Sequence, residues 1–325
     1  MNNNNKNQLW VEKYRPTTLD DVSAQSDVIQ SLRSSMKTQN IPHLIFYGPS
    51  GCGKTSTIIS LAKDLFGLEN YSDRIIELNA SDERGINIIR EKIKKYSKQS
   101  INKIDGIPPW KIIILDEADT MTYDSQFALR QIIEQYSKIT RFCIICNYYN
   151  KIIEPIISRC ALFRFKPIDS DSIINKLYYI CKQENIIYSD VILHKIITIC
   201  RGDLRKAINL LQKCYNSHSD DFNINILDDI SGIIPENQFN KLMEYIINQD
   251  DKNVDLLINQ FNIAGYSLVN QIISFHSFIL KSNFENNVKS KILYKLAEID
   301  QSLIKRCDEY IQFMKLAYFI MITIK

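Results

Sequence analysis

The sequence predicts an α/β domain followed by an all-α region. Five apolar segments of strand length lie between residues 43 and 165, and segments with helical periodicity separate them. This alternation indicates a parallel sheet with helices on both faces. Strand-like segments stop after Pro167, and the rest of the chain has helical patterns. A glycine-rich loop at residues 48–55 stands between the first strand and a helix, where nucleotide-binding loops occur.

Composition limits the possible classes of function. A chain of 325 residues is long enough for two or three domains, and 45% hydrophobic with 24% charged residues is ordinary for a globular protein. The net charge is only +3, so any binding to nucleic acid must come from a local basic patch. We expect no membrane span and no secretory signal. Residues 1–8 are polar and are expected to be disordered.

The loop at residues 48–55 has the P-loop pattern G-x-x-x-x-G-K-[ST] in the required context. The apolar strand 44–47 precedes it, and a helix predicted over 56–66 follows. Glycines let the backbone N–H groups face phosphate oxygens, the lysine reaches the β and γ phosphates, and the threonine hydroxyl can bind Mg²⁺. The alternative is a simple glycine-rich turn, which the lysine, the threonine and the preceding strand disfavour. The predicted phosphate-binding residues are Gly48, Pro49, Ser50, Gly51, Cys52, Gly53, Lys54 and Thr55.

The segments on either side of the P-loop fit the same pattern. Residues 19–36 predict a short turn and an amphipathic helix, and residues 74–78 predict a strand. The next helix is predicted over 86–98, with Asn79 or Ser81 as a possible cap. One side of it is apolar and the rest is basic. A basic helix face is either simply solvated or follows a phosphate backbone, and the residues alone favour neither reading.

An acidic pair ends the next predicted strand, residues 110–115. Asp116 and Glu117 lie at the carboxyl end of that strand, where parallel sheets bind ligands. Asp116 can hold Mg²⁺, and Glu117 can polarise a water for attack on the γ phosphate. Capping of the following segment is the alternative reading, and the upstream P-loop argues against it.

The two remaining strands of the sheet also carry polar residues near their ends. After a helix over 125–136, the strand 141–146 ends on Asn147, which could hydrogen-bond the γ phosphate or the attacking water. Residues 161–165 form the fifth strand, and Arg159 precedes it. Cys143 and Cys146 lie inside an apolar strand, so buried thiols are favoured over zinc or redox chemistry.

The second half of the chain is predicted to be helical and shows no catalytic pattern. Its last helices are strongly apolar, which indicates either a self-contained core or an oligomerisation surface. The predicted helices cover residues 172–184, 190–200, 204–215, 224–234, 239–247, 254–261, 268–280, 288–304 and 309–324.

Seven motifs in order resemble the AAA+ clamp-loader small subunits of the replication factor C family, over almost the whole chain. They are VEKYRP (11–16), GPSGCGKT (48–55), LNASDERG (78–85), ILDEAD (114–119), RFCIICN (141–147), SRC (158–160) and GDLRKAIN (202–209). ASDERG, ICNY and FRFKP resemble most the ATPase subunit that is fourth in human naming. The loop carries Ser50 and Cys52 where relatives often have proline and threonine, and neither position requires a particular side chain for phosphate binding.

The resemblance implies roles by motif position. Val11, Arg15 and Val22 would lie near the adenine of ATP, and Asn147 matches sensor 1. The P-loop lysine and threonine would hold phosphate and Mg²⁺, Asp116 would support the metal, and Glu117 would be the catalytic base. Arg159 would be an arginine finger that reaches the neighbouring subunit's ATP, although alone it reads as a surface arginine.

Further roles concern the lid and the DNA. Arg205 matches sensor 2 and would touch the γ phosphate within its own subunit, although alone an arginine in a first helical turn is unremarkable. Arg84 and the basic helix after it, with Arg90 and Lys94, would face the DNA backbone.

The implied protein is an ATPase subunit of a heteropentameric clamp loader that opens a sliding clamp of the PCNA type and loads it onto primer–template DNA. Its domains would be an AAA+ domain (1–167), a helical lid (168–234) and a helical collar (235–325), with ATP and Mg²⁺ as cofactors and the nucleus as location, in replication and repair. The alternatives are an ATP-binding scaffold subunit with little hydrolysis, or another AAA+ remodeller acting on DNA.

Overall fold

The computed structural model describes residues 8–22, 24–38, 40–81, 86–99, 106–186, 188–217 and 224–324. The chain divides into two compact units, residues 1–212 and 213–325, and each is described by itself. The predicted domain boundaries after residues 167 and 234 stay predictions. None of the helices in the described ranges has the length and apolar character needed to cross a membrane.

A five-stranded parallel sheet forms the centre of the first unit. Its strands run in the order β2-β3-β4-β1-β5. Every neighbouring pair is parallel, with Ile45 opposite Ile144 in β4 and Leu162 in β5. The strands are β1 (His43–Tyr47), β2 (Ile75–Asn79), β3 (Lys111–Asp116), β4 (Thr140–Cys146) and β5 (Cys160–Arg164). The predicted five-stranded parallel sheet is therefore confirmed.

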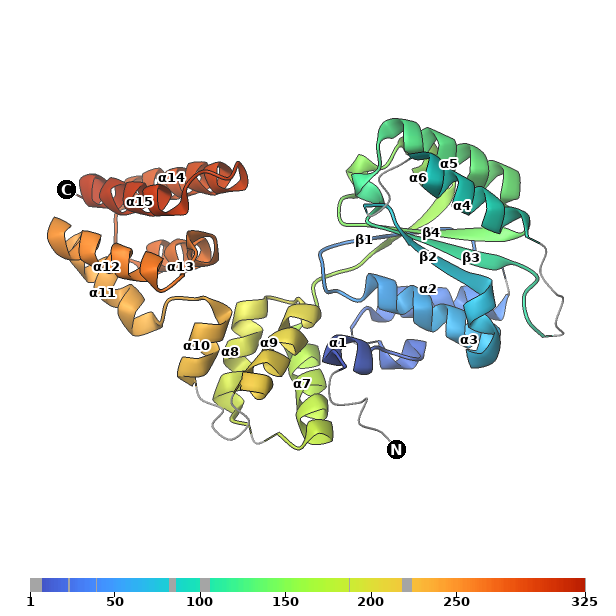
Figure 1. The fold of residues 1–325 in the computed structure, drawn as a ribbon, viewed down its shortest axis with the longest axis horizontal. Helices are drawn as coiled ribbons and strands as arrows, with labels where there is room; N and C mark the ends of the chain where they lie inside the picture. The colour runs from blue at the N-terminus through green and yellow to red at the C-terminus, as the bar shows by residue number, and fades with distance from the viewer. Residues whose placement is uncertain are drawn as a thin grey trace. The chain divides into compact units, whose positions relative to one another are not determined.

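Helices cover both faces of this sheet, as the alternating sequence predicts (Figure 1). On one face, α2 (Ser26–Lys37) and α3 (Lys54–Arg74) pack on the strands through a core that includes Leu32 and Phe66. On the other face, α4 (Ile86–Lys98), α5 (Tyr123–Tyr136) and α6 (Glu154–Ile157) pack through a core that includes Ile93. Short 3₁₀ turns are η2 (Leu19–Asp21), η3 (Ala118–Thr120) and η4 (Tyr149–Lys151).

The helix after the P-loop is longer than the sequence predicts. It begins at Lys54, directly after the loop, and continues to Arg74, with non-helical dihedral angles at Gly67 (φ 76°, ψ 158°). Glycine adopts such angles without strain, so the segment turns there and then resumes. Because the helix begins at Lys54, its first N–H groups face the loop, as phosphate binding requires.

Three further helices and the N-terminal segment complete the first unit. The helices are α7 (Ser170–Glu184), α8 (Asp190–Cys200) and α9 (Leu204–Ser217), the last of which runs past the boundary between the units. The short helix α1 (Trp10–Lys13) is tied to them by polar contacts. The backbone N–H of Trp10 donates to Oε1 of Gln212 at 2.9 Å, and the amine of Lys13 donates to Glu184 at 2.6 Å.

Helices are the only regular elements in the described residues of the second unit, as predicted. Its helices are α10 (Ile224–Ser231), α11 (Glu236–Ile247), α12 (Asp251–Ile263), α13 (Leu268–Lys281), α14 (Asn286–Ile304) and α15 (Glu309–Ile324). α11 to α15 share one core, in which Phe239, Phe275 and Phe313 are buried. The core accounts for the apolar character of these helices, although Tyr294 and Ile322 remain largely exposed.

Candidate nucleotide-binding site

One cleft in the first unit gathers the candidate residues at the carboxyl edge of the sheet. It is lined by Ser50 to Ser56 of the P-loop, by Asp116 and Glu117 after β3, by Asn147 after β4, and by residues from α1, α7 and α9. The sheet order explains the grouping, because β1, β4 and β3 are successive neighbours and all three are parallel. Their carboxyl ends therefore lie at one edge of the sheet.

Glycines give the P-loop its shape at two positions in particular. Gly51 has φ +67° and Gly53 has φ +94°, a region that other residues rarely adopt. A Cβ at Gly51 would also overlap the carboxylate of Asp203, and a Cβ at Gly48 would overlap the carbonyl of Phe165. The loop therefore has no room for side chains at Gly48 and Gly51.

The amine of Lys54 is buried at the start of α3, with 8% of the residue exposed. It donates to the carbonyl oxygens of Gly48 and Pro49, both at 2.7 Å, and to Oδ1 of Asn147 at 3.0 Å. The ammonium therefore lies inside the curl of the loop and next to the end of β4. A phosphate group in the loop would meet this charge.

Thr55 and Asp116 form a pair of oxygen ligands suited to Mg²⁺. The Thr55 hydroxyl donates to Oδ2 of Asp116 at 2.8 Å, and the Glu117 N–H donates to Oδ1 of Asp116 at 2.8 Å. Mg²⁺ prefers such oxygen ligands, and it completes its shell with water and substrate phosphates. The described residues contain no cluster of three or more metal-ligating His, Cys, Asp or Glu side chains. The donor set fits a metal that arrives with a nucleotide.

Glu117 is exposed and lines the cleft next to this pair. Its backbone is left-handed (φ 53°, ψ 36°), a conformation that non-glycine residues adopt rarely and often at functional sites. The turn places Glu117 directly after Asp116 at the mouth of the cleft. A carboxylate there can orient a water toward a phosphate.

The N-terminal segment forms another wall of the cleft. Val11, Arg15 and Val22 all line it, so the structure brings the three predicted adenine contacts together. Sequence reasoning missed Tyr14 and Lys176, which also line it. Burial lowers the pKa of Lys176, and burial together with Glu184 raises that of Tyr14.

Arg205 lies in the first turn of α9 and lines the same cleft. The start of α9 touches the P-loop: the Leu204 N–H donates to the carbonyl of Gly51 at 3.3 Å, and Ser50 Oγ donates to Oδ2 of Asp203 at 3.1 Å. The P-loop and Arg205 therefore belong to one hydrogen-bonded assembly. The residue pattern alone does not predict a role for Asp203.

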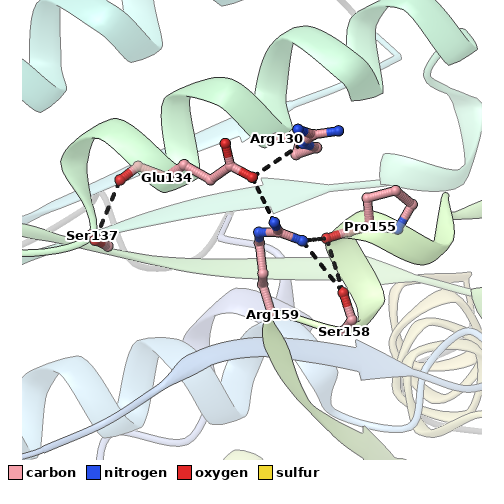
Figure 2. A network of polar contacts seen from close by, with 6 residues as sticks. All are labelled: Arg130, Glu134, Ser137, Pro155, Ser158 and Arg159. Carbon is pink, nitrogen blue, oxygen red and sulfur yellow. Dashed lines mark hydrogen bonds and ion pairs between the residues drawn. The ribbon is translucent and has the colours of Figure 1, made fainter.

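Arg159 is not among the residues that line the cleft. It follows α6, its side chain is 39% exposed, and it forms an ion pair with Glu134 of α5 (Figure 2). Arg159 therefore does not belong to the cleft of its own chain.

The predicted DNA-contacting residues are described only in part. Arg84 lies outside the described residues, and Arg90 is described only as part of α4. Lys94 is exposed on α4, while the neighbouring Ile93 is 1% exposed in the core. The helix therefore presents Lys94 to solvent, and its role stays a prediction.

Family models match the chain along its length. The model described as ATPase family associated with various cellular activities matches residues 44–168, and the Rad17 P-loop domain matches 2–80. The AAA+ ATPase lid domain of the RCF1/5-like type matches 175–215, and the replication factor C C-terminal domain matches 234–318.

Several curated proteins are similar over nearly the whole chain. Replication factor C subunit 2 of Schizosaccharomyces pombe is 42% identical over 94% of this chain and 92% of the relative. Replication factor C subunit 4 of Homo sapiens is 39% identical over 96% and 87%, and the small subunit of Archaeoglobus fulgidus is 41% identical over 94% of both.

Solved structures of the RuvB Holliday junction branch migration motor of Thermotoga maritima share the fold. One has a TM-score of 0.52 and 16% identity, and the match covers 72% of this chain and 79% of that one. At this identity the likeness concerns the fold alone.

Proposed function

Because the chain belongs to the replication factor C small-subunit family and is an AAA+ ATPase subunit of a clamp loader, we propose that its cleft binds ATP with Mg²⁺ and hydrolyses it within an assembly of different subunits. The observation that carries the proposal is the meeting of Lys54, Thr55 and Asp116 beside Glu117 and Asn147 in one cleft. A scaffold subunit without hydrolysis would have no need to keep all five.

Each residue has a chemical task in this proposal. Lys54 neutralises the β and γ phosphates, while Thr55 and Asp116 hold Mg²⁺. The metal, when bound, would neutralise charge on the phosphates. Glu117 orients the attacking water, and Asn147, already hydrogen-bonded to Lys54, fixes the position of the γ phosphate. Val11, Arg15 and Val22 contact the adenine side, and Arg205 reaches the γ phosphate from α9.

Arg159 completes the site of a neighbouring subunit in this proposal. Its exposure and its place outside its own cleft support an action between chains. An arginine supplied in this way is worth about 10³–10⁵ in rate in other phosphoryl-transfer enzymes. Hydrolysis would then depend on assembly.

The partners follow from the family in the same way. We infer a heteropentamer that opens a PCNA-type clamp and encloses primer–template DNA, with contacts mainly to phosphates, and that acts in the nucleus. The exposed Lys94 on α4 supports a sequence-independent, salt-sensitive contact, together with the predicted Arg84 and Arg90.

ATPase assays on the chain alone and in the assembled complex, with and without primed DNA and clamp, test the proposal. We expect slow hydrolysis alone and stimulation in the complex. Glu117→Gln should keep ATP binding and lose at least about 10²-fold in kcat, and Arg159→Ala should lose rate without losing ATP binding. A lone chain that hydrolyses ATP at the full rate, indifferent to partners and to Arg159, would refute the shared site.

A further inference from the structure

We propose that Glu134 is a positioning residue for Arg159: it fixes the guanidinium at the subunit surface in the orientation that meets a neighbour's nucleotide. The inference rests on the proposed action of Arg159 between chains. It assigns a task to a residue of α5 that carries none in the cleft, because Glu134 is not among the residues that line it.

Arg159 is held at two of its nitrogens by groups from two elements. Nη2 pairs with Oε1 of Glu134 at 2.7 Å, and Nη1 donates to the carbonyl of Pro155 at 2.7 Å and to Oγ of Ser158 at 3.4 Å. Figure 2 shows the guanidinium between α5 and the end of α6. A planar guanidinium held at both terminal nitrogens has a fixed orientation, which an exposed arginine does not have by itself. Pro155 and Ser158 belong to the segment next to Arg159, so Glu134 supplies the restraint from a separate element.

Arg130 offsets the negative charge of Glu134, so the surface around Arg159 stays positive. Its Nε donates to the same Oε1 of Glu134 at 3.1 Å, one helical turn earlier on α5. Two guanidinium groups and one carboxylate leave the cluster with a net charge of +1. Glu134 can therefore orient Arg159 without cancelling the positive charge offered to a phosphate. A single Arg–Glu pair would instead present a neutral surface.

Holding the Arg159 side chain in place before the reaction should affect the rate of ATP hydrolysis more than the stability of the fold. The side chains of the three residues are 38–39% exposed, so solvent screens their ion pairs, and such pairs add little to folding. A free arginine, however, loses much rotamer freedom when it is fixed in a transition state. If it is already fixed, that loss does not slow the reaction. The guanidinium has five N–H donors, so contacts to Glu134 and Pro155 leave donors for a phosphate.

The test is steady-state ATP hydrolysis by the assembled complex carrying Glu134→Gln. Glutamine keeps the shape and loses the charge. We expect kcat to fall about three- to tenfold with KM for ATP unchanged, because Glu134 would position an arginine that acts in the neighbour's transition state and would not itself bind the nucleotide. Glu69→Gln, at an exposed glutamate of α3, is the matched control and should leave kcat unchanged.

A double-mutant cycle with Arg159→Ala separates positioning from general damage. If Glu134 acts through Arg159, Glu134→Gln has no further effect once Arg159 is alanine. A structural defect would lower the rate in both backgrounds and would overturn the inference. An unchanged or raised kcat for Glu134→Gln alone would overturn it too, since a raised value would mean that Glu134 restrains the arginine. If Arg159→Ala itself leaves the rate unchanged, the proposed action between chains fails first.

Discussion

The hydroxyl of Ser50 donates a hydrogen bond to Oδ2 of Asp203, which is 3.1 Å away and 153 residues later in the chain, directly before α9. The other oxygen of Asp203 accepts from the backbone N–H of Lys206 at 3.0 Å and so caps α9. One buried carboxylate thus connects the phosphate-binding loop with the helix that carries Arg205.

Ser50→Ala should loosen the start of α9. The carboxylate of Asp203 is only 9% exposed and would lose one of its donors, which costs about 1 kcal/mol and corresponds to about fivefold faster local opening. Hydrogen exchange of a peptide covering residues 204–210 measures this change. Ser34→Ala, in an exposed turn of α2, is the control and should leave exchange in α9 as it is. Unchanged exchange in Ser50→Ala would mean that the hydroxyl contributes nothing to this contact.

Gly51→Ala should abolish nucleotide binding for two reasons. The left-handed φ of +67° strains any side-chain-bearing residue, and the new Cβ would overlap the Asp203 carboxylate. We expect the affinity for a fluorescent ATP analogue to fall more than tenfold. Gly106→Ala is the control for backbone strain outside the P-loop, because Gly106 has φ +81° and a Cβ there would meet nothing within 4 Å. That variant should bind the analogue normally, and normal binding by Gly51→Ala would contradict the close approach.

His43 should make the first unit less stable in mild acid. Burial, helped by the charge of Arg141, lowers the pKa of His43 to about 4, and Nδ1 accepts the backbone N–H of Phe142 at 3.1 Å. In the unfolded chain His43 is protonated near pH 6.5, whereas the folded chain resists its protonation. The contribution of neutral His43 to the stability of the fold is therefore fully present above pH 6.5 and is lost as the pH falls toward 4. We expect a loss of about 1–2 kcal/mol between pH 7 and pH 5.

Urea unfolding followed by tryptophan fluorescence measures this effect. Both tryptophans of the chain, Trp10 and Trp110, belong to the first unit, so the signal reports that unit. His43→Asn offers a non-titrating acceptor in place of Nδ1, and its stability should depend less on pH. Equal pH dependence in the two proteins would assign the acid sensitivity to other groups.

Lys111→Met should destabilise the C-terminal end of α4. The Lys111 amine, in a residue only 2% exposed, donates to the carbonyls of Tyr96 and Gln99 and lies 4.4 Å from the centre of the Tyr96 ring. Methionine fills a similar volume but leaves the helix end without this cation, at a cost of about 1–3 kcal/mol. Exchange of residues 95–99 should rise, whereas Lys138→Met, at an exposed lysine, should leave it unchanged. If the amides of residues 95–99 exchange as slowly in the Lys111→Met variant as in the wild type, the amine does not stabilise the helix end.

Strand ends were predictable because their position follows from the sheet. Asp116 and Asn147 each follow an apolar strand, and parallel strands bring such residues to one edge, so the sequence predicted their meeting with the P-loop. The limits of α4 and α15 also match the prediction.

Contacts between distant segments were not predictable in the same way. Lys176 and Tyr14 line the cleft, and Asp203 contacts the P-loop, from elements that the sheet order does not place. Their residue types alone indicate nothing about nucleotides. Phe127 of α5 is a large apolar residue and is still 49% exposed, because hydrophobicity does not show where a packing surface ends.

The distribution of thiols gives the protein a practical property. Of the eight cysteines, six are buried, Cys160 is half-buried, and Cys307 alone is exposed, between α14 and α15. A maleimide dye added to the folded chain should therefore react first at Cys307, with no engineered cysteine required. One fluorophore on the C-terminal unit would allow association with other subunits to be followed optically, with no label attached to a residue of the nucleotide cleft.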